Sequence, residues 1–203
     1  RRGIIDNKGS AYVGEQRVVR RTGLCGVSAN EDGFRPELSL EQGTQLLLSL
    51  SSMQSPMAHL PADASRNVIV VSSKPSAAVA DRLADAGAEL GAVAHIPISG
   101  AETEYQGPMW TCDPLVPDDL TGLSMRLSKT FEALDEGGYL LVESLNVFLM
   151  YAAEDRVVRF VDHLTELAQD HGITGIYTLV GDAVDEETCD RLRLSVDTEV
   201  DRR

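Results

Sequence analysis

The sequence predicts an α/β fold with a mainly parallel sheet flanked by helices. From residue 67 onward, short and fully apolar runs alternate with longer segments whose apolar residues recur at helical spacing. Strands that are apolar along their whole length are typical of parallel sheets, because helices cover both faces of such sheets. Hydrophobic residues make up 43% of the 203 residues, which is enough to bury a sizeable core.

We expect an N-terminal extension over residues 1–66, followed by an α/β domain over residues 67–203. In the extension, glycines separate short β-type runs, and residues 11–21 are suited to one or two strands. Residues 28–37 have the composition of a loop. The leucine-rich segment 38–53, with serines suited to capping, predicts the helix of this extension.

The α/β domain is predicted to contain four strands and four helices in alternation. The strands are expected at residues 68–71, 92–98, 139–144 and 175–181. The helices are expected at residues 75–90, 116–138, 156–172 and 185–196. Pro75 falls in the first turn of its helix, where the missing N–H costs nothing, and Gly172 ends the third helix. The tail at residues 197–202 predicts an additional edge strand.

The charge of the chain restricts its partners and its origin. The formal net charge is −14, which disfavours nucleic-acid binding because the phosphate backbone is also negative. Lys8, Lys74 and Lys129 are the only lysines among 18 basic residues. An acidic, lysine-poor composition is typical of halophilic cytoplasmic proteins, because hydrated carboxylates keep them soluble in concentrated salt. We therefore expect a cytoplasmic protein of a halophile, and the alternative is an ordinary acidic cytosolic protein.

The apolar runs and the cysteines show whether the sequence predicts a membrane span, disulfides or a metal site. No apolar run approaches the length of about 18 residues that a membrane-spanning helix needs, so no membrane span is predicted. Cys25, Cys112 and Cys189 lie far apart in sequence and lack metal-ligand spacing. They are interpreted as free thiols in a reducing compartment, and no metal site is predicted.

Three stretches together carry a resemblance to a known family. They are NVIVVSS (67–73), GGYLLVESLNVFLMY (137–151), and the helix and strand region 156–193. Their order resembles RecA-like ATPases of the KaiC type, and especially a haloarchaeal group of KaiC-like proteins. In that family an apolar strand ends in Asp-Ser-Leu, and Glu143 stands here at the acidic position. The resemblance implies a RecA-like fold and assembly of subunits into rings or filaments.

The turn that follows residues 68–71 lacks what a phosphate-binding loop requires. Such a loop uses glycines to turn backbone N–H groups toward the phosphates, a lysine to neutralise them and a hydroxyl to bind magnesium. The turn supplies Ser72, Ser73, Lys74 and Ser76, but it contains no glycine, and Pro75 lacks an N–H donor. We interpret it as a degenerate Walker A motif and predict no cofactor.

Glu143 has two interpretations. In functional RecA-like sites a carboxylate at the end of this strand holds the metal ion through water. Alternatively, Glu143 caps the turn that follows, and Ser144 and Asn146 share this structural role. If a nucleotide does bind, the site would hold ATP with magnesium. It would be lined by Ser72, Ser73, Lys74, Ser76, Glu143 and Ser144, with Ser99 and Asp182 nearby.

The preferred hypothesis is a non-catalytic RecA/KaiC-like protein, a pseudo-ATPase that acts as a regulatory or scaffolding module in a halophilic archaeon. It would bind a protein partner, either itself as a homo-oligomer or another chain. The N-terminal strand region and residues 147–151 are its candidate interaction surfaces. The alternative is a divergent nucleotide-binding ATPase or sensor. A signal-receiver domain is less consistent, because Asp118 and Asp119 begin a helix instead of ending the first strand.

Overall fold

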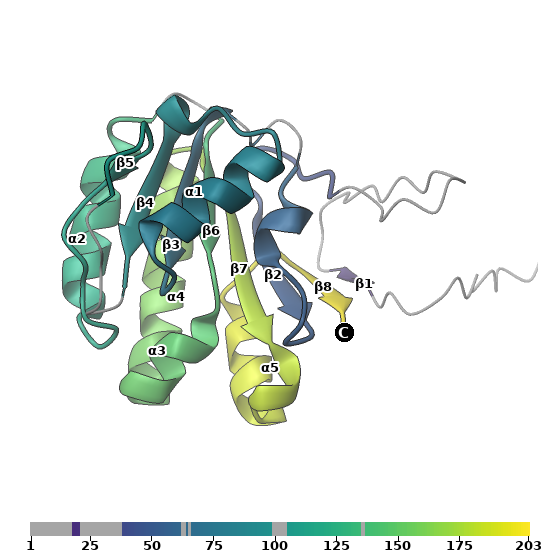
Figure 1. Cartoon of the computed structure of the whole chain (residues 1–203). Helices are drawn as coiled ribbons and strands as arrows, with labels where there is room; N and C mark the ends of the chain where they lie inside the picture. Colours follow the sequence, from purple (N-terminus) through teal and green to yellow (C-terminus); the bar gives the residue numbers. More distant parts are fainter. Residues whose placement is uncertain (1–17, 21–37, 62–63, 65, 99–104, 135–136) are drawn as a thin grey trace, which may run out of the picture.

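The computed structural model describes residues 18–20, 38–61, 64, 66–98, 105–134 and 137–203 (Figure 1). The predicted loop at residues 28–37, most of the N-terminal strand region and Ser99 lie outside the described residues. Within the described part, Val18–Arg20 form a strand, as expected for the segment 11–21. In that same part, no helix is both long enough and apolar enough to cross a bilayer.

One twisted sheet organises the described residues. Its strands, in chain order, are β1 (Val18–Arg20), β2 (Gln45–Leu50), β3 (Val68–Ser72), β4 (Val93–Pro97), β5 (Trp110–Thr111), β6 (Tyr139–Val142), β7 (Thr174–Val180) and β8 (Thr198–Arg202). Their spatial order is β1-β8-β2-β7-β6-β3-β4-β5. All neighbouring strands are parallel except β1, which is antiparallel to β8.

Helices cover both faces of the sheet. One face carries α1 (Ser76–Asp85) and the short helix η1 (Pro56–His59), and Figure 1 shows α1 in front of the strands. The other face carries α2 (Leu120–Phe131), α3 (Leu145–Tyr151), α4 (Glu154–Asp170) and α5 (Glu186–Leu194). Two further 3-10 turns, η3 (Leu90–Ala92) and η4 (Gly181–Ala183), lie in connections.

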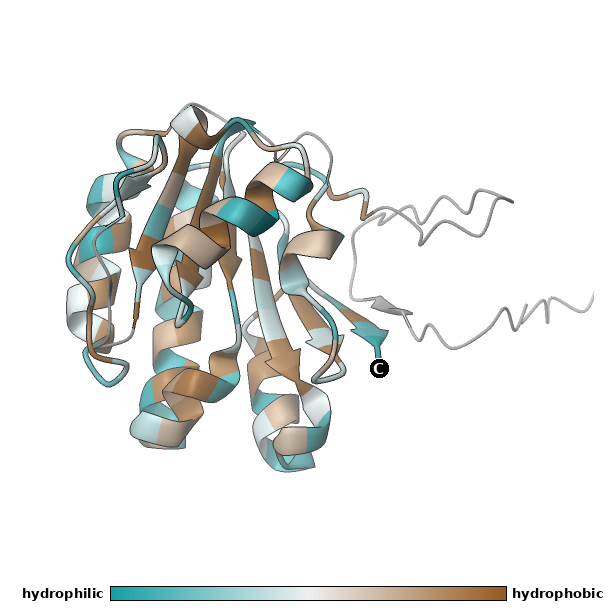
Figure 2. Cartoon of the chain, viewed as in Figure 1, coloured by the Kyte–Doolittle hydropathy of each residue, from teal (hydrophilic) through white to brown (hydrophobic). Residues whose placement is uncertain are grey.

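Two apolar cores explain this layering. On the α1 face, strand residues such as Leu48 and Val70 pack with Val79 and Leu83 of α1. On the opposite face, residues such as Leu47 pack with the larger helices. The strands are hydrophobic along most of their length, while the helices alternate hydrophobic and hydrophilic positions (Figure 2). The predicted α/β fold with a mainly parallel sheet is therefore confirmed.

Capping residues set the starts of two helices. The Asp119 side chain accepts a hydrogen bond of 2.8 Å from the backbone N of Gly122, and this contact begins α2. In the same way, Asp185 accepts a hydrogen bond of 2.9 Å from Thr188 N at the start of α5. The predicted helices and strands of residues 67–203 are present, with ends that differ by up to seven residues, the largest difference being the end of α2 at Phe131 instead of residue 138.

The helix predicted at residues 38–53 is wrong. Residues 45–50 form strand β2, which is buried at every position and lies between β7 and β8. Three consecutive leucines, Leu46–Leu48, cannot share one helix face, but a strand covered on both faces buries all of them. The sheet therefore contains strands from both sides of residue 66, where the sequence suggested a boundary.

Three smaller differences also have physical reasons. Residues 147–151, a candidate interaction surface, lie within α3, and this helix buries Leu145 and Phe148 while exposing Met150 and Tyr151. The two-residue strand β5 is too short to give a periodic signal. The last strand, β8, is not an edge strand, because β1 pairs with its outer side.

Candidate functional site

The connections of the sheet identify where a site would lie. The chain leaves β3 toward α1 on one face, and it leaves the neighbouring strand β6 toward α3 and α4 on the other face. Adjacent strands whose connections diverge in this way form a topological switch point, and open α/β sheets bind ligands outside the carboxyl ends of such strands. The border between β3 and β6 is therefore the place to look for a functional site.

Three residues at the carboxyl ends of these two strands are in direct contact. Glu143 comes immediately after β6 and is only 4% exposed. The hydroxyl of Ser72, the last residue of β3, donates a hydrogen bond of 2.5 Å to Glu143 Oε2. The Lys74 ammonium forms an ion pair with Glu143 Oε1. Ser72 Oγ also accepts a hydrogen bond of 3.0 Å from the backbone N of Lys74, which shapes the turn.

The charges in this contact compensate each other. Burial, together with a smaller repulsion by Arg82, lowers the pKa of Lys74 to about 8. The Glu143 carboxylate acts in the opposite direction, because an adjacent anion favours the ammonium form. With a pKa of about 8, Lys74 is mostly protonated at neutral pH, and its ammonium lies against the buried Glu143 carboxyl group. Both carboxylate oxygens are occupied by groups of the chain itself.

Ser76 points to a different cluster. Its hydroxyl lies 2.9 Å from His95 Nδ1 and 3.2 Å from Thr111 Oγ1, so it joins α1 to β4 and β5. The His95 side chain is fully buried, and burial lowers its pKa to about 4. The imidazole is consequently neutral at pH 7. Because His95 Nδ1 is paired with Ser76 in this cluster, we assign the imidazole a structural role at this edge of the sheet, although its buried Nε2 has no hydrogen-bond partner among the described residues.

The segment after Glu143 is held by a second set of polar contacts. Ser144 has a φ of +66°, which is an unfavourable conformation for a residue with a side chain. Its backbone N donates a hydrogen bond of 2.7 Å to Thr178 Oγ1. The Asn146 amide accepts from Val180 N at 2.8 Å and donates to Val180 O at 3.2 Å. These contacts tie the start of α3 to the end of β7.

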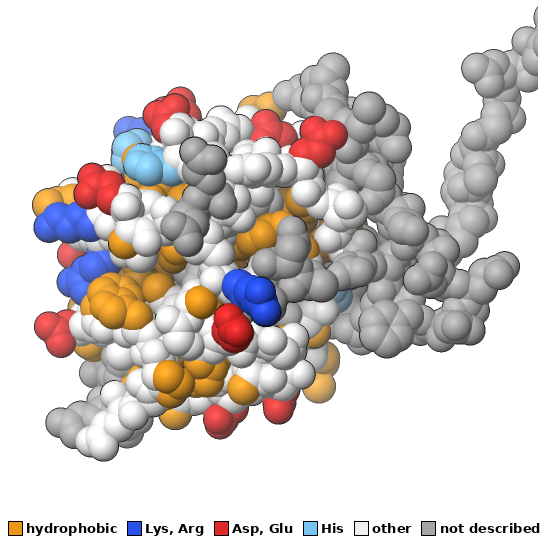
Figure 3. All heavy atoms as spheres, turned by 90° about the horizontal axis from the view of Figure 1, so that it is seen from above, with side chains coloured by type: hydrophobic (Ala, Val, Ile, Leu, Met, Phe, Trp, Pro, Cys, Tyr) orange, Lys and Arg blue, Asp and Glu red, His pale blue; other side chains and the backbone are white. Residues whose placement is uncertain are grey.

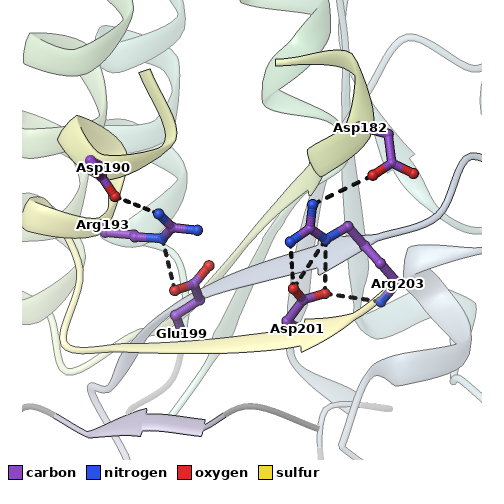
Figure 4. A network of polar contacts seen from close by, with 6 residues as sticks. All are labelled: Asp182, Asp190, Arg193, Glu199, Asp201 and Arg203. Atoms are coloured by element: carbon purple, nitrogen blue, oxygen red, sulfur yellow. Dashed lines mark hydrogen bonds and ion pairs between the residues drawn. The ribbon is translucent and has the colours of Figure 1, made fainter. Parts of the chain in front are cut away.

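Carboxylates near the end of β7 and along β8 are also neutralised internally (Figure 4). Arg203 forms ion pairs with Asp201 at 2.6 Å and with Asp182 at 3.4 Å. Arg193 contacts Glu199 at 2.9 Å and Asp190 at 2.5 Å. The hydrogen bond from Arg203 lowers the pKa of Asp201. Within the described ranges, no cluster of three or more His, Cys, Asp or Glu residues is placed to hold a metal ion.

The structure therefore divides the residues that the sequence analysis singled out. It joins Ser72, Lys74 and Glu143, leaves Ser73 exposed, and directs Ser76 and Ser144 to other partners. The sequence analysis did not identify His95 or Thr111. The signal for His95 was its position inside the apolar run 92–98, which predicts that the imidazole is buried. A buried imidazole needs a polar partner, and Thr111 could have been sought on that basis.

The comparison with solved structures confirms the resemblance at the level of the fold. A KaiC-like protein from the hyperthermophilic archaeon Pyrococcus horikoshii superposes with a TM-score of 0.56 at 12% sequence identity. The match covers 79% of this chain and 72% of that protein. The described residues thus have a RecA/KaiC-like fold.

Comparisons at the level of sequence are more restricted. No curated protein matches the chain significantly. A family model matches residues 52–201, which includes the whole candidate site at the ends of β3 and β6. The chain belongs to that family, which is described as a family of unknown function (DUF7504).

Proposed function

We propose that this chain is a non-catalytic RecA/KaiC-like module that regulates or scaffolds other proteins. The observation that carries the proposal is the compensated Glu143 carboxylate. Its two oxygens are bound to the Ser72 hydroxyl and the Lys74 ammonium. A magnesium ion would have to displace this ammonium before it could approach the carboxylate.

The turn after β3 adds a second argument. A phosphate-binding loop offers several free backbone N–H groups, and its lysine extends toward the phosphates. Here the backbone N of Lys74 already donates to Ser72, Pro75 has no N–H, and the lysine side chain is directed to Glu143. A triphosphate would find few donors in this turn, which supports an inactive site and a function through protein contacts.

The energetic cost of opening the pair points the same way. Removing the ammonium from the buried Glu143 carboxylate costs about 2–4 kcal/mol, because solvent screens part of the interaction of the 32% exposed Lys74 side chain. A nucleotide would have to recover this cost from new contacts. We therefore propose that the pair stabilises the end of the sheet and that partner binding occurs elsewhere on the surface.

The alternative is a divergent ATPase or a nucleotide sensor in which the ligand opens the ion pair. Two observations support this alternative. The pair lies at a topological switch point, and the Lys74 side chain retains 32% exposure, so it can be reached from solvent. In this case, ATP with magnesium would release Lys74 from Glu143 and convert binding into a conformational change.

Calorimetry with magnesium-ATP separates the two possibilities. The titration uses the full chain in molar KCl, because the acidic, lysine-poor composition is typical of halophilic proteins. We expect no binding heat. A micromolar dissociation constant, about −8 kcal/mol, would refute the proposal if Lys74→Met abolishes the binding. Lys129→Met is the matched control, since it removes a lysine far from the pair. Light scattering in the same buffer tests the proposed homo-oligomer.

A further inference from the structure

The outer surface of α2 and α4 contains a groove of about 730 Å³. We propose that this groove docks an acidic amphipathic helix of a partner protein. The inference rests on the proposed function, because it assigns a surface and a class of partner to a protein-interaction module.

Both helices contribute along the whole length of the groove. Leu120 and Arg156 lie near the helix starts, where Arg156 Nη2 donates to the Asp118 carbonyl oxygen at 3.2 Å. Glu132 and Leu167 lie near the other end. The 12 residues of α2 correspond to about 18 Å at 1.5 Å per residue. This length fits a docked helix of three turns.

The charge of the groove contrasts with that of the chain. Its lining includes Lys129, Arg156 and Arg159 but a single carboxylate, Glu132, whereas the chain has a net charge of −14. Figure 3 shows Lys, Arg and His side chains on its left side, where Figure 1 draws α2, together with Asp and Glu side chains that lie between them. The groove is therefore an electropositive surface on an acidic protein.

The cations of the groove also differ from other cations in their contacts. Arg191 pairs with Glu154 and Asp155, while Arg193 and Arg203 each pair with two carboxylates. Among the described residues, by contrast, Lys129, Arg156 and Arg159 form no ion pair with a carboxylate. Arg159 also acts on Asp155, but only at longer range, so the three cations can contact carboxylates supplied by a partner.

An apolar floor distinguishes this groove from a site for a simple anion. Leu120 and Phe160 are each only 5% exposed and form its base, while the Met125 side chain is 60% exposed at its wall. Methionine adapts to varied apolar partners, which makes it frequent at docking surfaces. Apolar residues spaced at i, i+3, i+4 and i+7 on a partner helix would contact this floor, and flanking carboxylates would reach the cations.

The same features argue against a nucleic acid. A long phosphate backbone would be repelled by a chain of net charge −14. The cations that line the groove are also interrupted by Glu132 and by apolar side chains. A short acidic helix needs only the local positive surface. The apolar face of such a helix would also cover the exposed Met125 side chain.

Fluorescence anisotropy with designed peptides tests the proposal. The probe is a labelled helical peptide of about 14 residues, with Leu on one face and Glu at flanking positions. A second peptide carries Lys in place of each Glu. We expect the acidic peptide to bind wild type and the basic peptide not to bind. The double variant Lys129→Glu/Arg159→Glu should weaken acidic-peptide binding at least about tenfold, and it should gain affinity for the basic peptide.

Arg126→Glu is the matched control, because Arg126 lies on the same helix but does not line the groove. It should change the affinity less than about twofold in 0.15 M salt, where screening acts over about 8 Å. Met125→Ala should weaken binding without altering its dependence on salt.

Several outcomes would overturn the assignment. Absence of acidic-peptide binding, equal binding of both peptides, or an equal effect of Arg126→Glu would each reject it. Self-association that the double variant abolishes would instead assign the groove to a second copy of the chain. Nucleotide calorimetry does not involve this groove, so the proposed function and the docking site can fail independently.

Discussion

Replacing Lys74 by methionine tests the most specific feature of the structure, the compensated carboxylate at the end of β6. Methionine keeps much of the aliphatic length of lysine but removes the ammonium group. Glu143 would then remain buried, with its side chain only 5% exposed, and would keep the Ser72 hydroxyl as its partner. The substitution therefore measures how much the Lys74 charge contributes to the free energy of unfolding.

The magnitude follows from the burial of the two partners. Removing one member of a fully buried pair costs about 3–5 kcal/mol. Lys74 retains 32% side-chain exposure, so solvent screens part of its interaction. We expect a loss of about 2–4 kcal/mol in the free energy of unfolding. For a chain of this size, each kcal/mol lowers Tm by about 2–4 °C, so the melting shift should be readily measured.

Guanidinium unfolding of a double-mutant cycle provides the assay. The cycle comprises wild type, Lys74→Met, Glu143→Gln and the double variant, with Lys129→Met as the control. We expect the double variant to be more stable than Lys74→Met, because its buried amide carries no charge. The deficit of Lys74→Met should also shrink in acid, where a protonated Glu143 is neutral. A loss equal to that of Lys129→Met would refute the reasoning.

Three further substitutions have expected outcomes. His95 has a pKa of about 4 in the folded chain and an ordinary value of 6.5, so the unfolded chain binds this proton at higher pH than the folded chain does. The free energy of unfolding should therefore fall by about 3 kcal/mol as pH decreases from 6.5 to 4, and His95→Leu should remove this part of the pH dependence in acid-unfolding curves. Leu47→Ala should cost about 2–5 kcal/mol in chemical unfolding because Leu47 is 1% exposed in the core, whereas Met53→Ala, at 93% exposure, should have almost no effect; equal losses would contradict the central position of β2. Ser144→Gly should raise the free energy of unfolding by up to about 1 kcal/mol, and Tm with it, because glycine adopts a φ of +66° without strain. A lower Tm would show that the Ser144 side chain stabilises the turn.

The strands and helices of residues 67–203 were predictable because each segment has a clear period and a clear stop. β2 was not, because a run such as Leu46–Leu48 gives no alternation, and short apolar runs do not distinguish a buried strand from a helix segment. Its identity depends on β7 and β8, which lie more than 120 residues later in the chain and supply its hydrogen-bonding partners. No local signal contains that information.

The candidate site was predictable to a similar degree. Ser72 and Glu143 each follow an apolar run, and parallel strands bring their carboxyl ends to one edge, so their proximity could be expected from the sequence. The direction of the Lys74 side chain could not, since a lysine in a turn is equally suited to solvent. The link between Ser76 and His95 depends on the packing of α1 against β4, which the sequence does not specify.

The polar contacts at the strand ends have a structural consequence that is independent of catalysis. β3 and β6 are buried at every position, so their hydrophobic pattern is nearly the same in any register. A shift by one residue would move Glu143 away from Ser72 and Lys74 and leave a buried charge without compensation. The ion pair therefore opposes such a shift, as the Asn146 contacts with Val180 do between α3 and β7. A carboxylate at the end of β6 is thus expected to persist for fold specificity even in a chain that binds no nucleotide.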